Sequence, residues 1–312
     1  MPRELHAIVN PMSGGGRTRR QWPRVVSQLE KLGWTVRSHV TSTPGQATGI
    51  ARELLSTGTG ELLSVGGDGT ANEIANGFFR DGAALAPEAV LSVLPMGTGH
   101  DFGRSIGVRE TADAVAALSQ GHVCPIDVGV AEYQVGSGRA TRYFVNVADV
   151  GIGALATAKI NRAPKVLGAF ATYLAGAARA IMTFESRPAR IVVDGTTVTE
   201  GPIHMVLIAN GRFGGGGMRL APMAQMADGL FDVFVLPAVP KHTLLLSLLP
   251  RAYRGTHPGH PALQYVRGRI VEVHAAGLPL EIDGEQPGTT DAHLRILPQA
   301  LRVRVPAGRT CP

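Results

Sequence analysis

Short apolar runs that end in glycine-rich loops alternate with helical patterns through the first part of the chain. Three such loops, at 11–16, 66–70 and 97–99, each follow an apolar run of strand length. Strands that alternate with helices favour an α/β domain with a mainly parallel sheet. Ligands of such sheets bind outside the carboxyl ends of the strands, so we expect these loops to form the ligand-binding edge.

The pattern changes after about residue 125. Two strands are expected around the turn GSGR and a hairpin around the DG of VVDGTTV, followed by further short strands to the end. One helical segment, at roughly 163–184, interrupts them. The sequence therefore predicts a second, antiparallel domain that begins near Asp127.

Composition narrows the classes of partner. The chain has 312 residues, 44% of them hydrophobic, and a formal net charge of +6, which suits an anionic partner without choosing one. Basic and aromatic residues are not interleaved in the way that stacks bases, so we expect no nucleic-acid binding. The two cysteines, Cys124 and Cys311, form no CxxC pair, which indicates neither a zinc site nor a disulfide scaffold and fits a reducing compartment.

Neither a secretory signal nor a membrane span is expected. The N-terminus has no apolar h-region, and no stretch approaches the length of about 20 apolar residues that a spanning helix needs. Two apolar segments, 167–184 and 242–250, are candidates for contact with a membrane surface, and packing in the core is the alternative for both.

Two nucleotide motifs are absent or incomplete. No lysine stands in the GxxxxGK[ST] pattern of a P-loop. Gly151, Gly153 and Ala156 match the dinucleotide fingerprint, but the next acid is Glu185 rather than one about 20 residues on. We therefore do not assign dinucleotide binding to this loop.

The first two glycine-rich loops suit an anion and a cation. NPMSGGGR, from Asn10 to Arg17, opens a helix whose first turn is basic, which indicates an anionic guest or a solvated basic face. In GGDGT, Asp68 can hold Mg²⁺ through its carboxylate, or Asp68 or Thr70 can cap a helix that starts at Ala71.

Five motifs occur in a fixed order: NPMSGGG, GGDGT, LPMGTGHDF, IANGRFGGGGMRLAPMAQMADGLFDV and IDGE. Together they resemble the diacylglycerol/sphingosine lipid kinase family in its soluble bacterial branch, from about Ala7 to Val305. The resemblance implies an α/β ATP-binding domain over 1–126 and a β-sandwich over 127–298, with 299–312 packing back on the first domain.

The same resemblance implies Mg²⁺- and ATP-dependent phosphorylation of a lipid hydroxyl. Glu285 would accept the proton and Asp68 would help to hold Mg-ATP. A metal would be bound by Asp228 with the backbone oxygens of Gln225 and Leu230. The positions implied to contact ATP are Asn10, Pro11, Ser13, Gly14, Thr41, Gly66, Gly67, Asp68, Gly69, Thr70, Asn72 and Thr98.

One position departs from the family pattern, because His100 stands where Asn is usual. A neutral histidine donates and accepts only through separate nitrogens, which changes what this position offers to the nucleotide. We expect a peripheral enzyme at the cytoplasmic face of the membrane, and a homodimer stays open. An NAD kinase-like enzyme and a non-catalytic nucleotide-sensing regulator are the alternatives.

Overall fold

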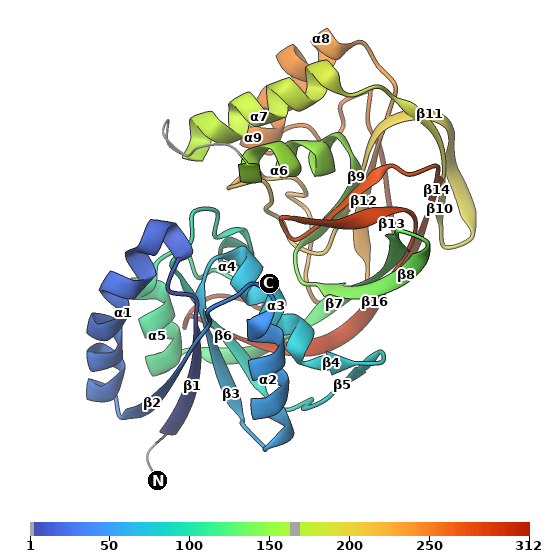
Figure 1. Ribbon diagram of the computed structural model, residues 1–312. Coiled ribbons are helices and arrows are strands. Elements are labelled where there is room, and N and C mark those ends of the chain that lie inside the picture. The colour runs from blue at the N-terminus through green and yellow to red at the C-terminus, as the bar shows by residue number, and fades with distance from the viewer. Residues whose placement is uncertain (1–2, 163–168) are drawn as a thin grey trace. The chain divides into compact units, whose positions relative to one another are not determined.

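The computed structural model describes residues 3–162 and 169–312 of the chain. The chain divides into two compact units, the first of 1–128 and 298–312 and the second of 129–297 (Figure 1). Two strands, β7 (His122–Val135) and β16 (Glu285–Val305), contribute residues to both units. The start of the expected helix, at 163–168, lies outside the described residues.

The first unit is built on a parallel sheet. Its strands run in the order β2 (Trp34–Val40), β1 (Arg3–Val9), β3 (Glu61–Gly66), β6 (Val90–Pro95) and the end of β16. Each neighbouring pair is parallel. Every residue of β3 and β6 is buried, as expected for central strands with both faces covered.

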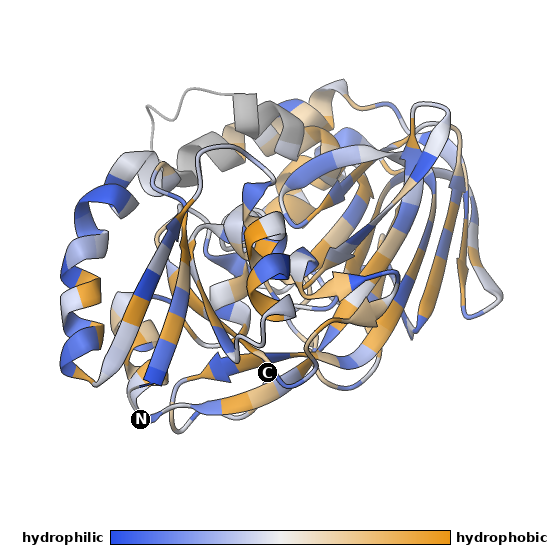
Figure 2. Ribbon diagram, turned by 60° about the horizontal axis from the view of Figure 1, so that its bottom comes forward, coloured by the Kyte–Doolittle hydropathy of each residue, from blue (hydrophilic) through white to orange (hydrophobic). Residues whose placement is uncertain are grey.

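Helices and one small hairpin complete the first unit. They are α1 (Ser13–Lys31), α2 (Gln46–Ser56), α3 (Asp68–Gly77), the hairpin β4 (Phe79–Arg80) and β5 (Ala83–Ala84), α4 (Asp101–Ser105) and α5 (Thr111–Gln120). Figure 2 shows both hydrophilic and hydrophobic residues along α1, and this helix buries Trp22, Val25 and Leu29 at helical spacing.

The second unit is antiparallel. Its main sheet runs β13-β12-β11-β10-β14-β16, β9 pairs with β11 and β15, β15 pairs with β16, and β7 forms a hairpin with β8. The bounds are β8 (Gly138–Phe144), β9 (Val147–Gly151), β10 (Arg187–Val193), β11 (Thr196–Ala209), β12 (Phe231–Pro237), β13 (Gln264–Gly268), β14 (Ile270–Ala275) and β15 (Pro279–Ile282).

The helices of the second unit are α6 (Ile152–Arg162), α7 (Ala169–Thr183), α8 (Lys241–Thr243), the π-helix η1 (Leu244–Leu248) and α9 (Leu249–Arg254). Alternate strand residues such as Ile191, Val206, Val233, Val271 and Leu294 form one apolar core with them. The predicted fold class, an α/β unit plus an antiparallel β unit, is confirmed. Among the described helices, none combines the length and the apolar character that a membrane crossing requires.

The cysteine pattern indicates no disulfide scaffold and fits a reducing compartment, whereas the structure joins the two cysteines in a disulfide. Cys124, on β7, and Cys311, next to the C-terminus, form a disulfide within the first unit. The two residues are 187 positions apart, so no local spacing signals the pairing. The bond fastens the C-terminal segment to the first unit, in which the end of β16 also pairs with β6.

Reduction of this disulfide is expected to destabilise the first unit. A crosslink that closes a loop of 187 residues restricts the unfolded chain, and such bonds contribute about 2–4 kcal/mol. We expect the midpoint of denaturant unfolding to shift to a lower denaturant concentration when a reductant is present. The Cys124→Ser/Cys311→Ser variant is the control: its midpoint should equal that of the reduced chain and should not change when the reductant is added. Equal midpoints for the oxidised and reduced chain would contradict a stabilising role.

Candidate active site

The three glycine-rich loops of the first unit touch one another, as expected for loops at one edge of a sheet. A Cβ added to Gly97 would lie 2.5 Å from Cα of Gly67 and 3.5 Å from Oγ of Ser13. The backbone N–H groups of Met96 and Gly97 both donate to the carbonyl of Gly66, at 2.7 and 3.0 Å. The contact between the second and third loops is therefore closed to any side chain and leaves bare backbone at this edge.

The first loop is shaped by three consecutive glycines, Gly14–Gly16, which lie within the bounds of α1 but are not helical: all three have left-handed φ between +60° and +80°. A Cβ on Gly14 would come within 2.4 Å of the carbonyl oxygen of Met96, which excludes other residues there. At the start of the same loop, Nδ2 of Asn10 donates to Oγ1 of Thr70 at 3.2 Å. The first loop is thus joined to both of the others.

Asp68 stands at the first residue of α3 and does not cap it. The helix begins three residues before Ala71, and no side chain makes a cap hydrogen bond at this end, so the capping alternative is wrong. Oδ1 of Asp68 instead accepts the backbone N–H of Phe102 at 3.0 Å. One carboxylate oxygen therefore fixes the third loop, and a carboxylate has further lone pairs for a hard cation.

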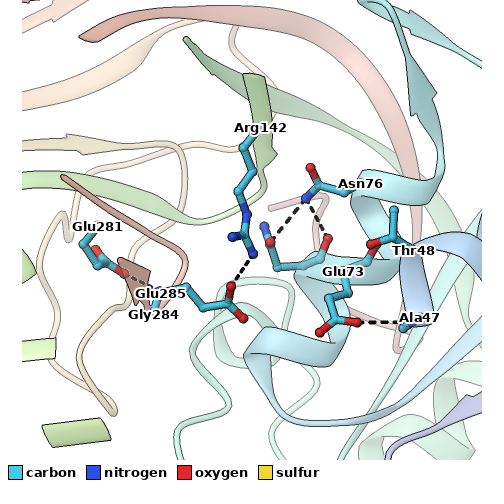
Figure 3. Close-up of polar contacts among 9 residues, drawn as sticks. Ala47, Thr48, Glu73, Asn76, Arg142, Glu281, Gly284 and Glu285 are labelled. Atoms are coloured by element: carbon cyan, nitrogen blue, oxygen red, sulfur yellow. Dashed lines mark hydrogen bonds and ion pairs between the residues drawn. The ribbon is translucent and has the colours of Figure 1, made fainter. Parts of the chain in front are cut away.

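The other positions implied to contact ATP lie in the same unit. Thr41 directly follows β2 and donates its N–H to the carbonyl of Val9 at 2.9 Å. Asn72 is fully buried and its side-chain oxygen accepts from Nδ2 of Asn76 at 3.2 Å, on α3 (Figure 3). Thr98 is exposed at the tip of the third loop. Pro11 lies in the first loop, Gly66 is the last residue of β3 and Gly69 lies in the first turn of α3.

Arg17 and Arg104 hold the third loop through contacts that the sequence does not predict. Nη2 of Arg17 donates to the carbonyls of Met96 and Gly97, at 3.3 and 2.9 Å. Nε of Arg104 donates to the carbonyl of Gly99 at 3.2 Å. The basic start of α1 is therefore not simply a solvated face, because Arg17 brings fixed positive charge to the loops. Its carbonyl partners are 79 and 80 residues away, and no local signal predicts them.

His100 lies between these groups with a left-handed φ of +59°. Burial lowers the pKa of its imidazole, and the negative charge of Asp68 only partly opposes that shift. Its Nδ1 is buried with no hydrogen-bond partner among the described residues. At neutral pH this position therefore presents an uncharged ring in place of the usual amide.

The second unit holds Glu285 at the end of a tightly fixed turn. The carboxylate of Asp283 accepts the backbone N–H groups of Val145, Asn146 and Val147 at 2.8–3.0 Å. Asp283 also has a left-handed φ of +45°, as a sharp turn into β16 requires. The partly exposed Glu285 forms an ion pair from Oε2 to Nη2 of Arg142, on β8, at 2.7 Å (Figure 3).

A buried pair of acids lies behind this turn. Asp149 of β9 and Glu281 of β15 are register partners, each about 5% exposed or less, and their side chains hydrogen-bond. Glu281 accepts the N–H of Gly284 in the turn (Figure 3), and Asp149 accepts that of Ala154 at the start of α6, at 2.7 Å. Two buried carboxyls that hydrogen-bond must share a proton.

The same pair accounts for the motif that resembled a dinucleotide fingerprint. A Cβ on Gly153 would lie 2.4 Å from Oδ2 of Asp149, and one on Gly151 would lie 2.3 Å from the carbonyl oxygen of His204. Both glycines are therefore required by close packing inside the second unit.

The acid pair predicts a pH-dependent stability. Burial raises the pKa of Asp149 to about 6, and it raises that of Glu281 well above its ordinary value, with the neighbouring Asp149 adding to the rise. The folded chain thus retains protons that the unfolded chain releases near pH 4. We expect the contribution of this pair to the free energy of unfolding to be fully present below about pH 4 and to be lost as the pH rises through about 6. Denaturant unfolding at a series of pH values measures this pH dependence of the free energy of unfolding.

Glu281→Gln tests whether the pair causes this dependence. The amide of glutamine accepts from Gly284 and donates to Asp149, so the contacts remain while one ionisable group is lost. We expect a shallower fall in stability with pH for the variant. A slope equal to that of the parent chain would show that other groups carry the effect.

At the residues implied to bind a metal, the guanidinium of Arg267 already occupies the carboxylate of Asp228. Oδ1 of Asp228 accepts the N–H of Leu230 at 3.1 Å, and Gln225 lies in the same loop between β11 and β12. The other carboxylate oxygen of Asp228 is paired with the guanidinium of Arg267 on β13. A divalent ion on that oxygen would lie against a second positive charge, so the residues as arranged do not fit a metal.

The two apolar segments are partly core and partly surface. In α7, Ala177, Ala180 and Ile181 are buried, whereas Met182 is 56% exposed. In η1, Leu244 and Leu248 are buried, whereas Leu246 is 80% exposed. Each segment therefore packs one face into the second unit and leaves large apolar side chains accessible.

Comparisons with known proteins identify both parts of the chain. The model of the diacylglycerol kinase catalytic domain matches residues 4–131, and that of the YegS C-terminal NAD kinase beta sandwich-like domain matches 146–305. A diacylglycerol kinase of Staphylococcus carnosus is 30% identical over 311 residues, which cover 98% of this chain and 96% of that protein.

Solved structures agree on the fold. The crystal structure of a diacylglycerol kinase from Bacillus anthracis has a TM-score of 0.73 at 20% identity, with 99% of this chain and 98% of that one covered. An NAD kinase from Archaeoglobus fulgidus in complex with ATP has a TM-score of 0.52 at 14% identity, with 97% and 94% covered. The resemblance inferred from the motifs and the kinase class of enzyme, a phosphotransferase with an alcohol acceptor, are both confirmed at the level of the family. The chain belongs to the diacylglycerol kinase catalytic domain family.

Proposed function

We propose that the protein is a lipid kinase that transfers the γ-phosphate of Mg-ATP to a hydroxyl of diacylglycerol or a related lipid. One observation carries the proposal: three glycine-rich loops meet at Ser13, Gly67 and Gly97, with Asp68 at the first turn of α3. Backbone N–H groups and a helix N-terminus suit the phosphates, and an adjacent carboxylate suits the cation that accompanies them.

Phosphoryl transfer needs positioning and charge neutralisation more than covalent help. In the proposed step the oxygen of the lipid hydroxyl forms a bond to the γ-phosphorus, and the bond from that phosphorus to the bridging oxygen of ADP breaks. Glu285 takes the proton of the hydroxyl, and Arg142 holds its carboxylate through the 2.7 Å ion pair. Mg²⁺, when bound with ATP, supplies positive charge against the phosphate oxygens.

The acceptor is proposed to be reached at a membrane surface. The exposed Met182 and Leu246 offer apolar area, and Lys241 and Arg251 lie on α8 and α9, on either side of η1. Apolar side chains beside basic ones favour the surface of an anionic bilayer. We place the enzyme at the cytoplasmic face, and light scattering on the purified chain decides between a monomer and a homodimer.

A panel of acceptors tests the proposal. The full chain is incubated with γ-labelled ATP, Mg²⁺ and vesicles that contain diacylglycerol, a sphingoid base, ceramide or phosphatidylglycerol. We expect label in the extracted lipid for at least one acceptor and far less when Mg²⁺ is replaced by EDTA. Label in none of the four lipids would refute the lipid kinase, and ATP binding without transfer would favour the nucleotide-sensing alternative.

A further inference from the structure

The loop at 225–230 has a positive charge supplied from within the chain. Asp228 lies just before Gly229, which has a left-handed φ of +74°, and its carboxylate bonds to the N–H of Leu230 on one side and to Arg267 on the other. This is the loop for which the family resemblance implies a metal. The part of this carboxylate that is removed from water is stabilised by a cation or by hydrogen-bond donors.

The position of Arg267 is set by the sheet. In the antiparallel pairing of β12 with β13, Arg267 lies directly opposite Asp232, and Tyr265 lies opposite Phe234. Nε of Arg267 is 3.7 Å from Oδ1 of Asp232, and the hydroxyl of Tyr265 donates to the same oxygen at 2.5 Å. A cross-strand partner is fixed by register, which distinguishes this contact from a chance pairing of long surface side chains.

The charges explain why the guanidinium lies there. Asp232 is buried, with about 1% of its side chain exposed, and Asp228 is about one-fifth exposed, so two acids face one region of limited solvent. An arginine keeps its charge at every ordinary pH and binds carboxylates through a planar fork of donors.

We infer that Arg267 takes the place of a structural divalent cation in this loop, so that the second unit folds and stays folded without bound metal. Mg²⁺ would have to displace the guanidinium from Asp228, and this ion gives up its own water reluctantly. The inference concerns the loop alone and stands whether or not the proposed lipid kinase activity is found.

Thermal unfolding of the full chain without nucleotide tests it. We expect the same midpoint in EDTA and in millimolar Mg²⁺, and no heat of Mg²⁺ binding by titration calorimetry. Arg267→Gln should lower the midpoint in EDTA by about 2–4 °C, and Mg²⁺ should restore part of the loss, because the carboxylate of Asp228 is then open to the ion. Arg269→Gln is the matched control, since Arg269 contacts Asp194 through its backbone N–H and should show neither effect.

A second variant keeps the test decisive if Arg267→Gln folds poorly. Asp228→Asn/Arg267→Gln removes both charges, and we expect it to be more stable than Arg267→Gln alone and indifferent to Mg²⁺. Two results would overturn the inference. One is a parent chain that Mg²⁺ stabilises as strongly as it stabilises Arg267→Gln. The other is an Arg267→Gln chain that matches the parent in EDTA and does not respond to the ion.

Discussion

Replacing Glu285 with glutamine is expected to lower kcat by about 10²–10⁴-fold while leaving the affinity for ATP close to that of the parent chain. Glutamine has nearly the same shape, keeps an acceptor for Arg142 and removes the only proton-accepting charge at this position. The turn should persist, because Asp283 and Glu281 hold it through the backbone rather than through Glu285.

The measurement is a steady-state rate with saturating vesicles, together with an equilibrium titration of ATP. Glu200→Gln, at an exposed glutamate of β11 in the same unit, is the matched control and should retain the parent rate. A rate for Glu285→Gln within a few-fold of the parent would remove Glu285 from the role of base. An equal loss in ATP affinity would indicate a disturbed fold instead.

Replacing Asp68 with asparagine should cost about 100-fold in kcat, equivalent to about 2.7 kcal/mol of transition-state stabilisation. Asparagine still accepts the N–H of Phe102 through its amide oxygen, so the link to the third loop remains. Its amide is uncharged, whereas we propose that the negative carboxylate of Asp68 helps to bind the cation that accompanies ATP.

The loss caused by Asp68→Asn should appear mainly in the part of ATP binding that depends on Mg²⁺. For the parent chain, ATP should bind more tightly in Mg²⁺ than in EDTA, and Asp68→Asn should remove most of that difference. Asp81→Asn is the control, because Asp81 is exposed in the β4–β5 turn and asparagine tolerates its left-handed φ of +51°. An undiminished Mg²⁺ effect in Asp68→Asn would place the cation on other groups.

Features that depend on local patterns could be predicted from the sequence. The alternation of strand and helix predicted the first unit, and the glycine-rich loops at 11–16, 66–70 and 97–99 do lie together in the structure. The motif order predicted the family. These succeed because hydrophobic period and turn chemistry are local, and because parallel strands place their carboxyl ends at one edge.

Contacts between distant residues could not be predicted in the same way. The disulfide joins Cys124 to Cys311, and Arg142 reaches Glu285 from a strand 143 positions earlier in the sequence. Such pairs depend on strand order and register, which a single sequence does not specify. Arg142 has no local signal at all: it stands in an ordinary hairpin strand.

The loop at 225–230 shows a different limit. A family motif carries residue types but not the neighbours that decide their role. Asp228 matches the family motif, yet Arg267 reaches its carboxylate from β13, outside the motif. The acid pair of Asp149 and Glu281 is similar, because each acid looks like an ordinary turn or strand residue until the β9–β15 register brings them together.

The most direct test of the lipid kinase proposal is a competition between two acceptors in one tube. The full chain is given γ-labelled ATP, Mg²⁺, diacylglycerol vesicles and an equal concentration of NAD, and the label in each product is counted over time. We expect the label to accumulate in the extracted lipid and to leave NAD unlabelled. Label that accumulates in NAD phosphate while the lipid stays unlabelled would contradict the proposal and favour an NAD kinase-like enzyme.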